Sequence, residues 1–176
     1  MYEVPEKIVA ADVSGAENRA AYDSQKMYHS HTLISFVPWH GLAGVRNNSI
    51  KKTARYQGET PSRPDLPRRE DLEKTSRRFA VKYLLAVMNS AAARDYLRAH
   101  RRSNIHLYPD DWKQLPIPEA TSDQQSPIIR LVDQILAARR NDRNADISSI
   151  EREVNILVNG LYGINPGSNE NQKKEA

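Results

Sequence analysis

The chain contains no cysteine among its 176 residues. A disulfide, a thiolate nucleophile and a cysteine-ligated zinc site are therefore all excluded. The absence fits a reducing compartment, and we expect the protein to be cytoplasmic.

Long hydrophobic runs are also missing. No apolar stretch approaches the ~20 residues that a membrane-spanning helix needs, and the N-terminus lacks the basic-then-apolar pattern of a signal peptide. Hydrophobic residues make up 39% of the chain, below the usual ~45–50%. We therefore expect no membrane partner, and one compact domain with a polar surface.

Motifs for catalysis are lacking as well. Amino-methyl transfer to a flipped base requires an Asn-Pro-Pro-aromatic loop and a Gly-rich turn for the methyl donor, and neither occurs. A metal-dependent nuclease requires an Asp spaced from an (Asp/Glu)-x-Lys pair, and Asp111-Trp112-Lys113 matches only the second half. We expect no catalytic residue and no cofactor, and neither methylation nor cleavage of DNA by this chain alone.

Three histidines deserve a separate test as metal ligands. His29 and His31 share a face if they lie in a strand, and His40 could approach them. No carboxylate stands at a helpful spacing, and a polar sheet face explains the pair more simply. We therefore expect no metal site.

Positive charge is concentrated in the middle of the chain. Residues 46 to 102 hold fifteen Lys and Arg against six Asp and Glu, whereas both flanks are slightly acidic. Such a block is typical of a phosphate-binding face, although a solvated helix surface gives the same count.

The N-terminal half has the pattern of short strands. Residues 7–13 predict a first strand, and residues 19–22 and 27–38 predict the arms of a hairpin that turns at 23–26. Loop residues are frequent from 39 to 48. Residues 57–69 contain three prolines and no periodicity, which predicts an exposed irregular loop.

Helical periodicity begins near Glu70 and becomes densely apolar up to residue 88. Asn89-Ser90 interrupts it, and residues 91–100 resume it. The prolines at 109, 116 and 118 then forbid a continuous helix, so residues 115–118 should form a stiff extended strap.

Two amphipathic helices follow the strap. We expect the first to begin with a capping box of Ser122 and Gln125, and the second to be capped by Asp146 or Ser148. A short polar connection predicts an antiparallel hairpin, and Gly163 a Schellman-type stop. The second helix has an apolar seam formed by Ile150, Val154, Leu157 and Leu161.

These elements predict an α+β fold. A small mixed or antiparallel sheet from the N-terminal half should pack on helices, and the chain should end in the C-terminal antiparallel helical hairpin. The predicted division is an α+β domain at 1–118, the hairpin at 119–164 and a disordered tail at 165–176.

Residues 108–118, Y-P-D-D-W-K-Q-L-P-I-P, are followed by Q-Q-x-x-I-I-x-L-V-D-x-I-L and L-V-x-x-L-Y-G. This order resembles the C-terminal end of TaqI-like specificity domains, the target-recognition parts of type IIG restriction-modification DNA methyltransferases. Upstream segments continue the resemblance in order, and they are P-E-K-I-V at 5–9, A-Y-D at 21–23, N-S-I at 48–50 and Y-L-L-A-V-M-N-S at 83–90. One departure is that such domains normally follow a complete methyltransferase, and their own first strands and helix precede the point where this chain begins.

The resemblance implies non-catalytic recognition of double-stranded DNA beside a methyltransferase domain or subunit. The residues suited to DNA contact are polar and clustered in the basic block, and we predict Arg46, Asn47, Asn48, Lys51, Lys52, Arg55 and Tyr56. A second row at Arg77, Arg78 and Lys82 could contact phosphates or be the solvated side of a helix. The alternatives are docking or self-association through the C-terminal helices, and an inactive fragment of a split enzyme.

Overall fold

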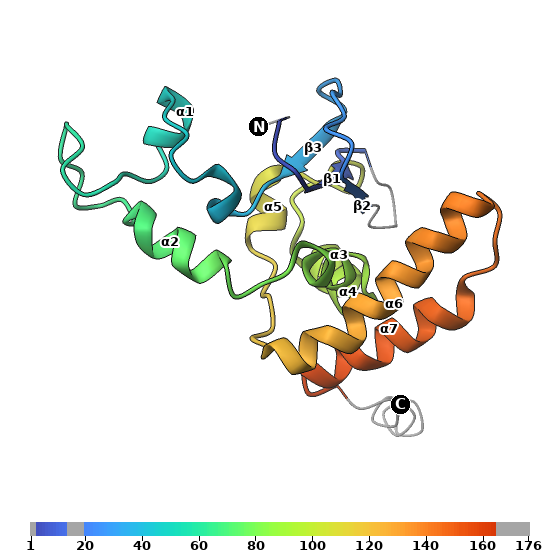
Figure 1. Ribbon diagram of the computed structural model, residues 1–176. Coiled ribbons are helices and arrows are strands. Elements are labelled where there is room, and N and C mark those ends of the chain that lie inside the picture. The colour runs from blue at the N-terminus through green and yellow to red at the C-terminus, as the bar shows by residue number, and fades with distance from the viewer. Residues whose placement is uncertain (1–2, 14–19, 165–176) are drawn as a thin grey trace.

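The structure is a computed structural model, and it describes residues 3–13 and 20–164. Its fold is α+β, with a three-stranded antiparallel sheet in the N-terminal half and helices through the rest of the chain (Figure 1). The strands are β1 (Lys7–Ala11), β2 (Ala20–Asp23) and β3 (Leu33–Phe36). The tail predicted at 165–176 lies outside the described residues.

The predicted hairpin between the second and third strands is wrong. The strand order is β2-β1-β3, so both strands pair with β1 and not with each other. The Asp23 carboxylate accepts from the Gln25 and Met27 N–H groups and forms a buried 2.5 Å ion pair with Lys7. These bonds turn the chain away from β2. The backbone N–H and C=O groups of β1 pair with β2 on one edge and with β3 on the other.

The helical elements are η1 (Trp39–Leu42), α1 (Asn48–Lys51), α2 (Arg69–Ser76), α3 (Val81–Asn89), α4 (Ala91–His100), α5 (Pro109–Lys113), α6 (Ser122–Asn141) and α7 (Ser148–Leu161). The interruption predicted at Asn89-Ser90 is confirmed, because Ser90 is extended and its hydroxyl accepts from the Ala93 N–H at the start of α4. A second interruption at residues 77–80 was not predicted. The loop residues from 39 to 48 include η1.

Helix α3 lies at the centre of the main core. It contacts β1, β2, α4, α6 and α7, and it is buried on nearly every side. Its buried apolar side chains are Val81, Tyr83, Leu85, Ala86, Val87 and Met88. A helix that is apolar all round can be stable only inside a core, which explains its dense hydrophobic sequence.

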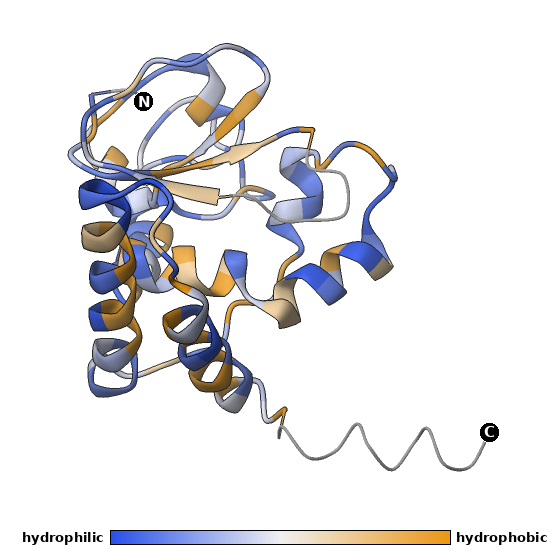
Figure 2. Ribbon diagram, turned by 90° about the vertical axis from the view of Figure 1, so that its right-hand side faces the viewer, coloured by the Kyte–Doolittle hydropathy of each residue, from blue (hydrophilic) through white to orange (hydrophobic). Residues whose placement is uncertain are grey.

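The predicted C-terminal hairpin is confirmed. Helices α6 and α7 lie side by side, and apolar and polar residues alternate along the turns of both (Figure 2). Val154 and Val158 are buried, and Ile150, Leu157 and Leu161 pack partly buried against the same core. The apolar seam of α7 is therefore covered within this chain.

The ends of the hairpin helices refine the prediction. The capping box of α6 uses Thr121 and Gln124, one residue earlier than expected. Gln125 is instead buried and bonds the backbone of Arg78, Ala80 and Ala120, so it ties α6 to the start of α3. The predicted cap of α7 by Asp146 or Ser148 is wrong, because the N-cap residue is Ile147 and no side chain among the described residues caps the helix. Asp146, one residue before it, accepts from the Ser148 N–H at 3.0 Å.

The proline strap runs without helix or strand between α5 and α6. Two tyrosines hold it by donating hydrogen bonds to its carbonyls, from Tyr83 to Pro118 at 2.7 Å and from Tyr162 to Pro116 at 2.6 Å. The strap is thereby fixed to α3 and to the end of α7.

These tyrosines predict a loss of stability in alkali. Burial raises the pKa of Tyr83 and of Tyr162 to about 12, above the ~10 of an unfolded chain. Because the folded state keeps these protons longer, their contribution is complete below about pH 10 and is lost as the pH rises through 12. The free energy of unfolding in urea should therefore fall between these pH values, and less steeply for Tyr162→Phe. If the free energy of unfolding fell equally with pH in the wild type and in Tyr162→Phe, the Tyr162 hydroxyl would not contribute in this way.

Candidate nucleic-acid interface

Residues 39–76, here called the basic lobe, project from the body of the molecule (Figure 1). The lobe contains η1, α1 and α2, and α2 packs on η1. Leu42 and Ile50 form a small core with Val4, separate from the main core. His40 joins the two ends of the lobe, because its backbone N–H and its ring both bond the Ser76 hydroxyl.

Arg69 is the centre of the basic lobe. Its side chain is 1% exposed and donates to the carbonyls of Leu42 and Val45. It lies 3.4 Å from the Glu73 carboxylate and stacks over the Tyr56 ring at 4.5 Å. One guanidinium therefore connects the end of η1 and the segment after it, Tyr56 in the loop that follows α1, and helix α2. Arg69 lies at the start of α2 and not in the predicted irregular loop at 57–69, and its i, i+4 spacing to Glu73 was a usable signal.

Two of the predicted DNA-contacting residues have structural roles. The Tyr56 hydroxyl donates to Glu73 at 2.5 Å and accepts from the Gly44 N–H at 2.8 Å. The Asn47 side-chain oxygen Oδ1 accepts from the Ile50 N–H at 2.8 Å and caps α1. Both polar groups are therefore used within the lobe.

Four other predicted residues gather at α1, and we call Arg46, Asn48, Lys51 and Lys52 the exposed α1 group. Arg46 and Lys51 lie 3.8 Å and 4.0 Å from the same oxygen of Glu59. The other oxygen of Glu59 accepts from the Tyr56 N–H, which fixes the carboxylate in place. Asn48 and Lys52 are exposed beside them. The group presents three cations and one amide at a short capped helix: Arg46 precedes the Asn47 cap, Asn48 and the partly exposed Lys51 lie on the helix, and Lys52 follows it.

Arg55 belongs to the loop that follows α1. Its backbone forms a bridge with Arg68, and its guanidinium donates to the Thr60 carbonyl at 2.9 Å. The predicted residues therefore divide between the α1 region and the loop that follows it. Arg68 was not predicted as a site residue. The backbone bridge that brings it next to Arg55 spans the whole loop between them, and such a contact leaves no local pattern in the sequence.

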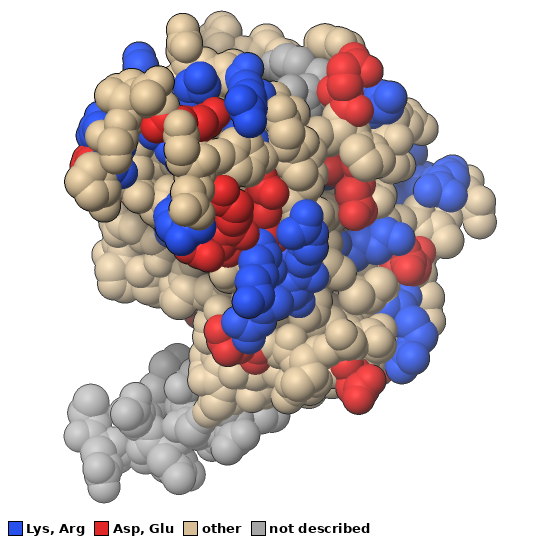
Figure 3. Space-filling model, turned by 60° about the vertical axis from the view of Figure 1, so that its left-hand side comes forward, with Lys and Arg blue, Asp and Glu red and all other residues tan. Residues whose placement is uncertain are grey.

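The charge on the lobe is mixed. Residues 39–76 hold eight Lys and Arg against five Asp and Glu, and Figure 3 shows acidic side chains lying between the basic ones. A hydrogen-bonded ion pair with Arg63 lowers the pKa of Asp65 to about 2. Any DNA contact must therefore be made by particular cations and not by a uniform basic face.

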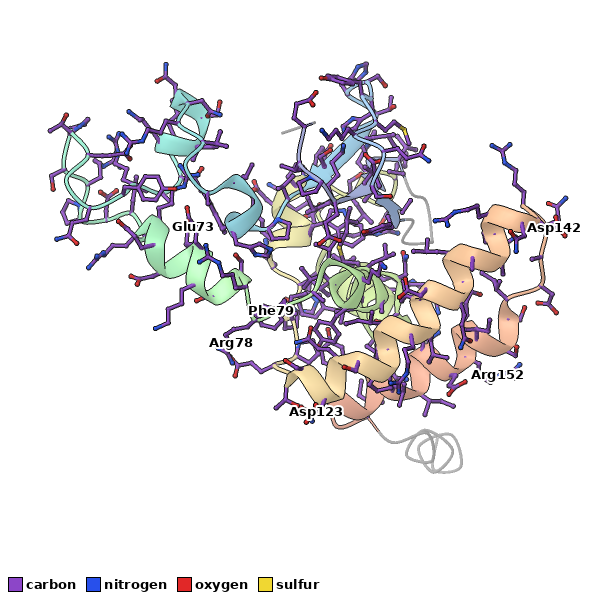
Figure 4. The ribbon with its side chains drawn as sticks, in the orientation of Figure 1. Glu73, Arg78, Phe79, Asp123, Asp142 and Arg152 are labelled. Carbon is purple, nitrogen blue, oxygen red and sulfur yellow. The ribbon has the colours of Figure 1, made fainter. Side chains whose placement is uncertain are left out.

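The second basic row is partly tied to the body. Arg78, labelled in Figure 4, lies between α2 and α3 and pairs with Glu119 at 3.0 Å. Lys82 pairs with Asp133 of α6 at 2.5 Å. Arg78 thus reaches the segment before α6 and Lys82 reaches α6 itself, whereas Arg77 is exposed and has no ion pair among the described residues. The solvated-helix interpretation therefore fits this row better than a phosphate row does.

The Asp-Trp-Lys segment has a structural role. Asp111 is buried and accepts from the Tyr108 N–H at 2.8 Å, which closes the first turn of α5. Trp112 packs edge-on against Phe36 with ring centroids 5.7 Å apart. Lys113 pairs with Asp110 at 2.9 Å, so the lysine and the buried carboxylate do not form the pair of a nuclease.

The predicted hairpin arm at 27–38 is a strand only at β3, so His29 and His31 lie outside the sheet. The His29 ring bonds the Ser35 hydroxyl at 2.6 Å. Among the residues that the structure describes, no group of three His, Asp or Glu is placed to hold a metal ion. Within the same residues, no helix has both the length and the apolar character needed to cross a bilayer.

Comparisons of the chain with family models, with curated proteins and with solved structures gave no match.

Proposed function

We propose that the chain binds double-stranded DNA through the basic lobe and supplies target recognition, without catalysis, to a restriction-modification DNA methyltransferase. The observation that carries the proposal is the exposed α1 group, which projects from the body on a lobe with its own core. The sequence resemblance to TaqI-like specificity domains supports the choice of DNA.

The side chains of the exposed α1 group suit both parts of DNA recognition. Lys51 and Lys52 can neutralise phosphates, and Arg46 and Asn48 can donate to base edges in the major groove. Recognition requires these groups to be held in fixed geometry. The Asn47 cap and the buried Arg69 supply that rigidity from within the lobe.

A methyltransferase domain or subunit is the partner that this function requires. The resemblance implies that such a partner contacts the other side of the duplex, since the chain lacks the motifs for methyl transfer. Binding should therefore be measured both with the chain alone and with a methyltransferase of the same system added.

The salt dependence of DNA binding tests the proposal. Each phosphate contact adds about −0.9 to the log–log slope of affinity against salt, so Lys51→Ala with Lys52→Ala should flatten the slope by about two. Asn48→Ala should instead lose ~1–3 kcal/mol on the preferred sequence and leave non-specific affinity nearly unchanged. Fluorescence anisotropy with a labelled duplex measures both quantities.

The matched control is Arg139→Ala with Arg140→Ala, which removes two exposed positive charges from the end of α6. This double variant should keep the wild-type slope. The basic lobe is not the DNA surface if this control flattens the slope as much as the lysine pair does. The same conclusion follows if the lysine variant keeps the wild-type slope both alone and with the methyltransferase added.

A further inference from the structure

A hollow of about 340 Å³ lies inside the loop from residue 55 to 68. Three arginines line it, and we call it the arginine hollow after Arg55, Arg63 and Arg68. Glu59 lines it as well and also faces Arg46 and Lys51, so the hollow adjoins the exposed α1 group.

The backbone holds two of these arginines next to each other. Arg55 and Arg68 form a parallel bridge, closed by bonds from the Arg55 N–H to Pro67 and from the Arg69 N–H to Arg55. Bridged residues direct their side chains to one face, and like charges at such positions repel each other. The two guanidinium groups are therefore brought together by the chain and not by mutual attraction.

The bonds of these two guanidinium groups go to neutral oxygens. Arg55 donates to the Thr60 carbonyl at 2.9 Å, and Arg68 donates to the Gln57 amide oxygen at 2.8 Å. Among the described residues neither has a carboxylate within the 4.0 Å of an ion pair.

The nearby carboxylates are already engaged. Asp65 forms two hydrogen bonds with Arg63, and Glu70 accepts from the Gln57 N–H. Glu59 faces Arg46 and Lys51. The positive charge of Arg55 and Arg68 is therefore only distantly compensated, which favours an added anion in the hollow.

We propose that the arginine hollow binds a phosphate group, held by Arg55 and Arg68. A guanidinium offers planar pairs of N–H donors that match the oxygens of a phosphate, and charge-assisted bonds of this kind are among the stronger hydrogen bonds in proteins. The assignment of this phosphate to DNA rests on the proposed function. In that function the phosphate belongs to the DNA backbone beside the bases that the exposed α1 group contacts. The same chemistry would also accept free phosphate.

The first arm of the test uses inorganic phosphate and pyrophosphate, titrated into isotope-labelled protein and followed by backbone amide shifts. Residues 55–68 should show saturable shifts. Arg55→Gln with Arg68→Gln should weaken the affinity on the order of tenfold or more, because two charge-assisted contacts are lost. Arg68→Gln alone, at an exposed position, serves if the double variant does not fold. Arg77→Gln is the matched control and should bind as the wild type does.

The second arm measures DNA binding against salt with the same variants. A slope flattened by about two in the double variant assigns the phosphate to DNA. An unchanged slope together with saturable phosphate shifts assigns the hollow to a free phosphate. Absence of shifts at residues 55–68 with both anions, or equal affinity in wild type and variants, overturns the inference.

The outcomes separate this inference from the proposed function. Phosphate shifts in a protein that binds no duplex DNA would retain the inference and refute the function. A lysine pair that flattens the salt slope, with no phosphate shifts in the hollow, would retain the function and refute the inference.

Discussion

Replacing Arg69 with alanine should unfold the basic lobe and abolish DNA binding, although Arg69 itself is too deeply buried to contact DNA. The change leaves the Leu42 and Val45 carbonyls without their donor and the buried Glu73 without its cation. Removing one partner of a buried ion pair costs about 3–5 kcal/mol. We expect rapid proteolytic cleavage within residues 39–76 and a lower free energy of unfolding in urea.

Arg77→Ala is the matched control for Arg69→Ala, since Arg77 is an exposed arginine at the end of the same helix. It should leave both the cleavage pattern and the stability near those of the wild type. Arg69→Lys keeps the charge but cannot bond the two carbonyls and Glu73 together. Its free energy of unfolding should therefore lie between those of Arg69→Ala and Arg77→Ala. Wild-type resistance to proteolysis in Arg69→Ala would show that the small apolar core alone holds the lobe.

Ile128→Ala should destabilise the whole chain by ~2–5 kcal/mol, because Ile128 is completely buried and a truncated core side chain leaves a cavity. Helix α6, which carries it, packs on both α3 and α7. Urea unfolding followed by circular dichroism measures the loss.

Ile156→Ala supplies the control within the same hairpin. Ile156 is 51% exposed on α7, so the same deletion should change stability by no more than ~0.5 kcal/mol. Equal losses for the two variants would contradict the observed packing. Leu157→Asp tests the seam independently, since an unchanged melting temperature with loss of self-association would mean that the seam faces a partner.

Local patterns in the sequence predicted several elements well. The apolar density of residues 81–88 predicts the central helix, the predicted break at Asn89-Ser90 ends in a Ser90 cap, and the prolines at 116 and 118 define the strap. Periodicity, capping and proline geometry depend on neighbours only a few residues away, so the sequence contains all the information that they require.

The strand order had to come from the tertiary structure. The polar residues after Asp23 suit a hairpin turn, but Asp23 instead pairs with the buried Lys7 opposite it on β1. Whether two strands pair with each other or with a third depends on contacts between distant parts of the chain. Those contacts are decided by the sheet as a whole and not by the turn between two strands.

The roles of the arginines were decided in the same way. Arg68 and Arg69 are adjacent and chemically identical, yet Arg68 is exposed at the arginine hollow and Arg69 is buried inside the lobe. The sequence by itself determined that this region is basic and irregular. Only the folded chain determines which guanidinium meets carbonyls from residues 42 and 45, because burying a charge is tolerable only where distant groups converge to satisfy it.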